Sequence, residues 1–151
     1  MTIELGALLT MKPEIKAEWL KRLRSGNIPQ TPSVLHRIDN GAMCCLGVLS
    51  EVAYDAGIVD RTEGRTSIED DDAVPVYVYV GNVDEDRFDK SDFGLTQTVC
   101  HWADFIDDVG STTSLGLLPF SGREDTKIYL ADLNDGGMSF DQIADIIEYW
   151  Y

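Results

Sequence analysis

Apolar residues recur every three or four positions in several parts of the chain, which is the pattern of helices that bury one face. The first predicted helix begins at Pro13, which suits a first turn, and ends before Gly26. Its apolar face also carries Lys16, whose ammonium group we expect in water above an apolar stem. A second helix is predicted to begin near Cys44 and to end at Ala56, with Gly57 after it.

The second half of the chain shows the same pattern. A helix is predicted after Thr96, which we expect to cap its N-terminus. Two more helices end the chain as a hairpin over residues 126–150, and Ser139 with Gln142 forms a capping box at the start of the last one. That helix turns four apolar side chains to one face: Phe140, Ile143, Ile146 and Ile147.

Strict alternation of residue types marks the strands. Residues 73–80, AVPVYVYV, place valines on one face and tyrosines on the other and give the clearest strand. A shorter strand is predicted at 33–38, before a turn at 39–41, and residues 60–72 are predicted to be a polar, acidic loop. Together these elements predict an α+β fold. We expect a single globular domain over residues 1–151, with about five helices packed around a small antiparallel sheet and a C-terminal helical hairpin.

The charge of the chain is strongly negative and unevenly distributed. The formal net charge is −15. Residues 1–47 hold six basic and four acidic residues, whereas residues 48–151 hold six basic and 23 acidic residues. A field of this sign repels polyanions, so we expect neither duplex nucleic acid nor a membrane as a partner. The short apolar patch near the N-terminus has no basic residue before it, and the three cysteines occur without a secretory signal, which predicts a cytoplasmic protein.

Two adjacent cysteines, Cys44 and Cys45, raise the question of a reactive or metal-binding site. A structural zinc site needs cysteines two to four residues apart, and neither Cys44-Cys45 nor Cys100-His101 has that spacing. A disulfide between neighbours strains the backbone. Catalysis would need an exposed thiolate beside a base such as His36 or His101. We therefore expect the pair to be buried as small hydrophobic side chains, and we assign no metal, no cofactor and no catalytic residue.

Two acidic stretches have competing interpretations. Residues 84–94 do not fit a calcium loop, because Phe88 and Asp89 stand where a ligand and the turn glycine are needed. Both stretches could be solvated loops that confer solubility, or they could imitate DNA phosphates. The side chains of such a DNA-like surface are Asp70, Asp71, Asp72, Asp84, Glu85 and Asp86. The C-terminal hairpin is not predicted to read DNA, because no basic residue follows Lys127.

The basic segment, residues 21–37, is the local signal most compatible with a small anionic ligand. Cationic side chains near free backbone N–H groups of a loop bind phosphate, and an aromatic ring can stack on a base. We predict a ligand site built from cationic groups, a histidine and aromatic rings: Lys16, Arg22, Arg24, His36 and Arg37 with Tyr77, Tyr79 and Trp102. The alternative is a solvated basic face that offsets the acidic remainder of the chain.

Three segments taken together resemble a known family. They are a first helix ending Leu-Arg-Ser-Gly, a Cys-Cys-Leu-Gly-Val-Leu segment, and a final hairpin with Leu-Asn-Asp and Ile-Ala-Asp. In these segments the chain resembles a widespread group of small, uncharacterised accessory proteins of tailed bacteriophages. Where that group usually has Gln-Gly-x-Gly after the first helix, this chain has Gln30, Thr31, Pro32 and Ser33. The resemblance implies a phage accessory protein in the cytoplasm of the infected bacterial host.

These observations leave three hypotheses for the function. The first is a non-enzymatic binding protein, forming a homo-oligomer, that counters host defence by sequestering a small nucleotide-derived signal at the predicted ligand site. The second is an acidic inhibitor that binds a host defence enzyme through a surface similar to that of DNA. The third is a hydrolase that uses Cys45 or His101, and we rank it last because the sequence brings no base and nucleophile together.

Overall fold

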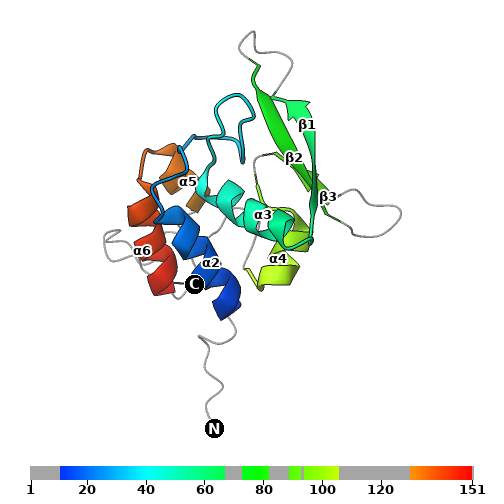
Figure 1. The fold of residues 1–151 in the computed structure, drawn as a ribbon. Coiled ribbons are helices and arrows are strands. Elements are labelled where there is room, and N and C mark those ends of the chain that lie inside the picture. Colours follow the sequence, from blue (N-terminus) through cyan, green and yellow to red (C-terminus); the bar gives the residue numbers. More distant parts are fainter. Residues whose placement is uncertain (1–10, 67–72, 82–88, 93, 106–129, 151) are drawn as a thin grey trace.

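The fold combines a group of helices with a small antiparallel sheet that lies at one side of them (Figure 1). The computed structural model describes residues 11–66, 73–81, 89–92, 94–105 and 130–150. In chain order its elements are α2 (Pro13–Leu23), α3 (Cys45–Asp55), β1 (Asp60–Arg65), β2 (Pro75–Gly81), β3 (Asp89–Ser91), α4 (Gln97–Ala103), α5 (Leu130–Asp135) and α6 (Phe140–Trp150). The described residues thus form an α+β domain with five helices, three antiparallel strands and a C-terminal helical pair, and the predicted fold class is confirmed.

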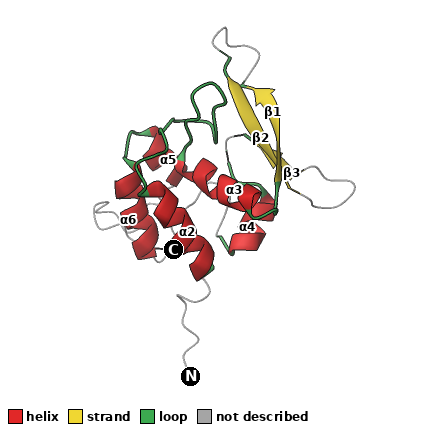
Figure 2. Cartoon of the chain, viewed as in Figure 1, coloured by secondary structure: helices red, strands yellow, loops and turns green. Residues whose placement is uncertain are grey.

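Helix α3 is the centre of the helical part and packs against both α2 and α5, while α6 packs against α2 and α5 (Figure 2). Six consecutive residues of α3, 45–50, are buried, so this helix is covered on several sides rather than along one stripe. Trp19 of α2 is fully buried, and its indole N–H donates to the Cys45 carbonyl over 2.9 Å. The same ring meets Phe105 edge-on, with centroids 5.5 Å apart.

The predicted helix caps are present. Thr96 Oγ1 accepts a hydrogen bond from the Val99 N–H at the start of α4, over 3.3 Å. At the start of α6 the Ser139 Oγ accepts from the Gln142 N–H, and the Gln142 Oε1 accepts from the Ser139 N–H, each over 3.2 Å. These bonds satisfy N–H groups that the first turn of a helix leaves without an intrahelical partner.

Strand β2 is the centre of the sheet and pairs antiparallel with β1 on one side and with β3 on the other. The register of β1 and β2 runs from Asp60 opposite Val80 to Arg65 opposite Pro75. The strand predicted over residues 73–80 is therefore confirmed as β2, within two residues at its start.

The prediction of a loop over residues 60–72 is wrong for its first half, because residues 60–65 are the strand β1. The segment has no apolar side chain, and four of its six residues are exposed. An edge strand gains its hydrogen bonds from its one neighbour, here β2, and does not need a buried face of its own. Polar composition therefore does not exclude regular structure in an edge strand.

The short strand predicted at 33–38 is also wrong. This segment makes only isolated bridges, through His36 with Met43 and through Arg37 with Val76. Ser33 has a φ of 72°, which turns the chain out of an extended path before the segment can pair over any length.

Asn134, near the end of α5, fastens the C-terminal hairpin to the centre of the fold. Its buried Oδ1 accepts hydrogen bonds from the Cys45 N–H, over 3.1 Å, and from Gln30 Nε2, over 2.8 Å. Its Nδ2 donates to the Thr31 carbonyl over 2.9 Å. A buried amide with all these partners ties three distant segments of the chain together without an unsatisfied polar group.

Candidate functional site

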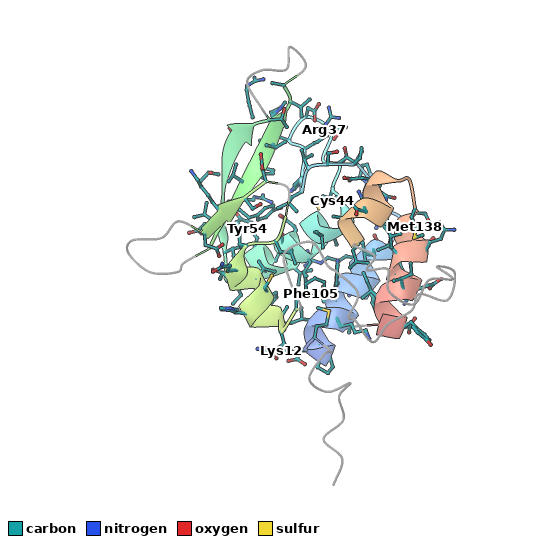
Figure 3. The ribbon with its side chains drawn as sticks, turned by 180° about the vertical axis from the view of Figure 1, so that it is seen from behind. Lys12, Arg37, Cys44, Tyr54, Phe105 and Met138 are labelled. Carbon is teal, nitrogen blue, oxygen red and sulfur yellow. The ribbon has the colours of Figure 1, made fainter. Side chains whose placement is uncertain are left out.

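Cys44 and Cys45 are buried at the start of α3, with 4% and 0% of their surface exposed, so the prediction that they belong to the core is confirmed. Figure 3 shows Cys44 inside the molecule. Its Sγ accepts a hydrogen bond from the Gly47 N–H over 3.3 Å, and the Cys45 Sγ lies 3.6 Å from the Leu130 carbonyl oxygen. Burial raises the pKa of Cys44 to about 11 and that of Cys45 well above its ordinary value. Both thiols are therefore protonated near neutral pH, in the form that is not nucleophilic.

We expect a thiol reagent to modify the native protein at the half-buried Cys100 and not at the adjacent pair. In a Cys100→Ser variant, native Cys44 and Cys45 should react about a hundredfold more slowly than in denaturant, because they must first become exposed. The measurement is the rate of reaction with a chromogenic disulfide reagent near neutral pH. Rapid stoichiometric labelling of the native variant would contradict the burial of the pair.

The two arginines predicted as ligand groups on and just after α2 already have carboxylate partners. Arg22 Nη1 lies 2.8 Å from Asp55 Oδ2 at the end of α3. Arg24 Nη2 lies 2.8 Å from Asp145 Oδ1 and 2.8 Å from Glu148 Oε2, both on α6. A phosphate at this place would have to replace these carboxylates.

The other members of the predicted set are placed as follows. Lys16 is half-buried, and its Nζ donates to the Glu148 carbonyl over 3.0 Å. Arg37, which is labelled in Figure 3, lies near one end of the sheet and makes two hydrogen bonds to Asp39, of 3.0 and 2.6 Å. Trp102 on α4 is half-buried and packs against the core. The predicted cationic groups thus lie in two different regions of the fold, and the single phosphate site stays a prediction.

The structure brings His36, Tyr77 and Tyr79 together with three residues that the sequence did not indicate. They form a polar cluster where α3 meets the sheet, which we call the Glu51 cluster: His36, Glu51, Tyr54, Arg61, Tyr77 and Tyr79. Figure 3 labels Tyr54, which marks this junction.

Glu51 holds the cluster together through both of its carboxylate oxygens. Oε1 pairs with the Arg61 guanidinium, and Oε2 accepts a hydrogen bond from the Tyr79 hydroxyl over 2.6 Å. The Arg61 guanidinium lies over the rings of Tyr54 and Tyr77, 4.1 and 4.2 Å from their centroids. A cation over two aromatic faces and beside a carboxylate is held in one orientation.

The hydrogen bonds of the cluster assign its protons. The Tyr79 hydroxyl gives its one proton to Glu51, so it accepts at 2.9 Å from the His36 Nδ1, which must carry a proton. In neutral His36 the Nε2 atom is then the acceptor. The His36 side chain is 9% exposed, so this imidazole is oriented by a tyrosine and a carboxylate in a nearly closed environment.

The electrostatics of the cluster favour a fixed, charge-balanced arrangement. Burial alone would raise the pKa of Glu51, but His36, Tyr79 and Arg61 together outweigh it and lower the pKa to about 2. Burial, and the hydrogen bond to the ionised Glu51, raise the pKa of Tyr79. Glu51 is therefore ionised and Tyr79 protonated at neutral pH, and the Glu51–Arg61 pair carries no net charge. The arrangement orients an imidazole beside the Tyr79 hydroxyl, which stays protonated and donates to Glu51, so this hydroxyl is not activated as a nucleophile.

The sequence pattern does not indicate Glu51, Tyr54 and Arg61 as site residues. Arg61 lies in the range 60–72 that is predicted to be a loop, and a loop position does not indicate a partner on a helix. One signal in the sequence is Glu51 itself, which is a carboxylate within the mostly apolar helix CLGVLSEVAYD. An acidic residue that such a helix buries requires a partner.

Three further points concern the acidic stretches, metal binding and membrane-spanning helices. The acidic side chains at 70–72 and 84–86 lie outside the described residues. Within the described ranges no three or more histidine, cysteine, aspartate or glutamate side chains are grouped so that they could hold a metal ion. Of the helices in this part of the chain, none has the length and apolar character needed to cross a membrane.

A family model matches residues 11–150, which is nearly the whole chain, and its description is a domain of unknown function, DUF8296. The chain belongs to this family. The matched range takes in α2, α3, the sheet and the C-terminal hairpin, so the DUF8296 domain comprises all the elements described above. No curated protein and no solved structure matches the chain.

Proposed function

We propose that this DUF8296 protein is a phage accessory protein that counters a host defence by binding, without catalysis, a positively charged surface of a host protein. The phage origin rests on the resemblance of its first helix, its Cys-Cys segment and its final hairpin to such proteins. The mode of action rests on the charges of the structure.

The observation that carries the proposal is the neutralisation of the basic segment by the protein's own carboxylates. Arg22, Arg24 and Arg37 each have a carboxylate oxygen within 2.8 Å. The cations that would attract a phosphate are therefore occupied, and a partner meets the field of a chain with net charge −15. Such a field accelerates and orients the approach of a basic surface and repels an anionic ligand.

The buried chemistry supports binding rather than catalysis. Both members of the cysteine pair are buried, and the imidazole of His36 is enclosed in the Glu51 cluster. Neither arrangement offers an exposed nucleophile with a base beside it, which covalent hydrolysis requires.

The test is affinity capture with the purified full chain from a lysate of a bacterial host, followed by titration of the captured protein in purified form. We expect the Kd to weaken by about tenfold or more when the salt rises from about 0.1 M to about 0.5 M, since exposed charges are screened. Binding that is indifferent to salt would contradict the proposal.

Two variants with the same change in net charge locate the binding surface. One neutralises the second acidic stretch: Asp84→Asn, Glu85→Gln and Asp86→Asn. The matched control neutralises three exposed carboxylates on the helices: Glu14→Gln, Asp132→Asn and Asp141→Asn. A larger loss in the first variant supports the second acidic stretch as the contact, whereas equal losses would indicate steering by the overall field and would contradict a DNA-like surface there.

The nucleotide-sequestering hypothesis stays a prediction and is tested with the same preparation. Native mass spectrometry with cyclic dinucleotides, cyclic trinucleotides and ADP-ribose derivatives would reveal a bound nucleotide. A retained, unmodified nucleotide would replace the host protein as the ligand, and a converted one would support an enzyme instead.

A further inference from the structure

Strand β1 forms one edge of the sheet, and its outer side has no partner strand in the described residues. In an antiparallel pair, residues alternate between those whose N–H and C=O groups point to the neighbour and those whose groups point away. The Thr66 N–H donates to the Val74 carbonyl over 3.1 Å, in line with the β1–β2 register. Residues of the same parity, 60, 62 and 64, therefore bond to β2.

The other three residues of β1, Arg61, Glu63 and Arg65, point their backbone groups away from β2. The other side of β2 shows the same alternation. There the Pro75 carbonyl accepts from the Ile38 N–H, and the Tyr77 N–H donates to the His36 carbonyl, so the backbone groups of these two residues point away from β1. No hydrogen bond joins the backbone groups of residues 61, 63 and 65 to other described residues. A sheet edge of this kind is a template for another strand.

We propose that β1 pairs with β1 of a second copy of the chain, antiparallel and about a two-fold axis, so that the two sheets join into one. In such a dimer the same surface of each copy forms the contact. Two strands form hydrogen bonds only between residues whose backbone groups point toward each other. The residues that can exchange backbone hydrogen bonds across the axis are therefore 61, 63 and 65.

Charge selects the register among these possibilities. The longest overlap sets Glu63 opposite Glu63 and Arg61 opposite Arg65, which places like charges face to face. The register that sets Glu63 opposite Arg65 of the second copy gives two attractive pairs by symmetry. The side chains of Glu63 and Arg65 are exposed and can form these pairs. Arg61 is not needed for them and keeps its ion pair with Glu51.

The remaining residues of β1 fit the same register. Gly64 then faces Gly64 of the second copy at the two-fold axis, in the type of pair where two strands approach most closely. Thr62 faces Thr66 of the second copy, and threonine pairs stabilise neighbouring strands. Charge, size and side-chain type thus agree on one arrangement.

The test is sedimentation equilibrium of the full chain over about 10 μM to 1 mM. We expect a reversible monomer–dimer equilibrium with a Kd of roughly 10–500 μM, because the contact is small. Glu63→Arg and Arg65→Glu should each weaken it by about tenfold, and the double variant should restore it, because the charge pairs are then re-formed in reverse. A chain that stays monomeric over this range would overturn the proposal, and so would a double variant that fails to restore association.

A second variant tests the backbone contact independently of charge. Glu63→Pro removes an N–H that points outward and leaves the hydrogen bonds to β2 in place. We expect dimerisation to be lost, while a Glu63→Thr control, which keeps the N–H, retains more of it. Circular dichroism checks that the proline variant is folded. If it is not folded, the sedimentation results of the charge variants alone test the proposal. Unchanged self-association of a folded Glu63→Pro protein would overturn the proposal.

Discussion

A Gly47→Ala variant is expected to lose about 3 kcal/mol of folding stability or more, because there is no room for a methyl group at this position. A Cβ on Gly47 would lie 1.7 Å from the Leu35 carbonyl oxygen and 2.6 Å from the Leu35 carbonyl carbon. These atoms belong to the backbone and cannot rotate away. The same oxygen accepts the Cys44 N–H over 3.1 Å, and the Leu35 N–H donates to the Asp92 carbonyl over 2.7 Å, so a shift of the segment would break both bonds.

The measurement is the free energy of unfolding from urea titration, with Gly136→Ala as the matched control. A Cβ on Gly136 would lie 3.2 Å from the Asp132 carbonyl oxygen, in an exposed turn that can adjust. We expect this control to change the stability by less than about 1 kcal/mol. A Gly47→Ala protein as stable as the control would show that α3 does not lie against Leu35 as described.

Two of the segments that carry the resemblance to phage accessory proteins lie side by side in the structure. Gly47 lies in the Cys-Cys-Leu-Gly-Val-Leu segment, and Asn134 lies in Leu-Asn-Asp. In the structure the Asn134 side chain accepts the N–H of Cys45, so the two segments are in direct contact at the start of α3. Ser33 has a φ of 72° and occupies a position where the resembled group usually has glycine, which adopts this conformation without strain. Asn134 and Cys45 therefore have a packing role in this chain, and the resemblance of their segments does not by itself mark a ligand site.

The helices could be predicted from the sequence because their signals are local. Pro13, the cap Thr96 and the capping box of Ser139 with Gln142 each act within one turn, and all three take the predicted role. Strand β1 could not be predicted in this way, because its stability comes from β2, which follows it, and not from its own side chains.

The candidate site was harder to predict because its contacts join residues that are distant in the sequence. Arg24 pairs with Asp145 and Glu148, more than 100 residues away, and nothing in the local pattern around Arg24 indicates this. The charges along the sequence therefore indicate a basic segment without partners. In the folded chain, carboxylates from α6 lie beside Arg24 and offset its charge.

The second large effect is expected at Glu51. Glu51→Ala should lower the free energy of unfolding by about 3 kcal/mol or more, because it takes the carboxylate partner from the half-buried Arg61 guanidinium and from the buried Tyr79 hydroxyl. The Glu51 side chain is only 15% exposed, so water replaces the lost carboxylate poorly. Asp55→Asn is the control, since Asp55 also pairs with an arginine but is 50% exposed, and we expect a loss of about 0.5 kcal/mol or less there.

The same carboxylate makes stability depend on pH in a defined window. The folded protein lowers the pKa of Glu51 from 4.5 to about 2. A lowered pKa stabilises the fold at pH values above the unfolded pKa, so this contribution is complete above about pH 5 and is lost as the pH falls toward 2. Its size is about 3 kcal/mol, from the shift in pKa. Urea titrations of wild type and Glu51→Gln between pH 6 and pH 3 should therefore converge as the pH falls, because the glutamine variant lacks this titration. If the difference in stability between the two proteins stays constant over that range, Glu51 is not held ionised by Arg61, Tyr79 and His36.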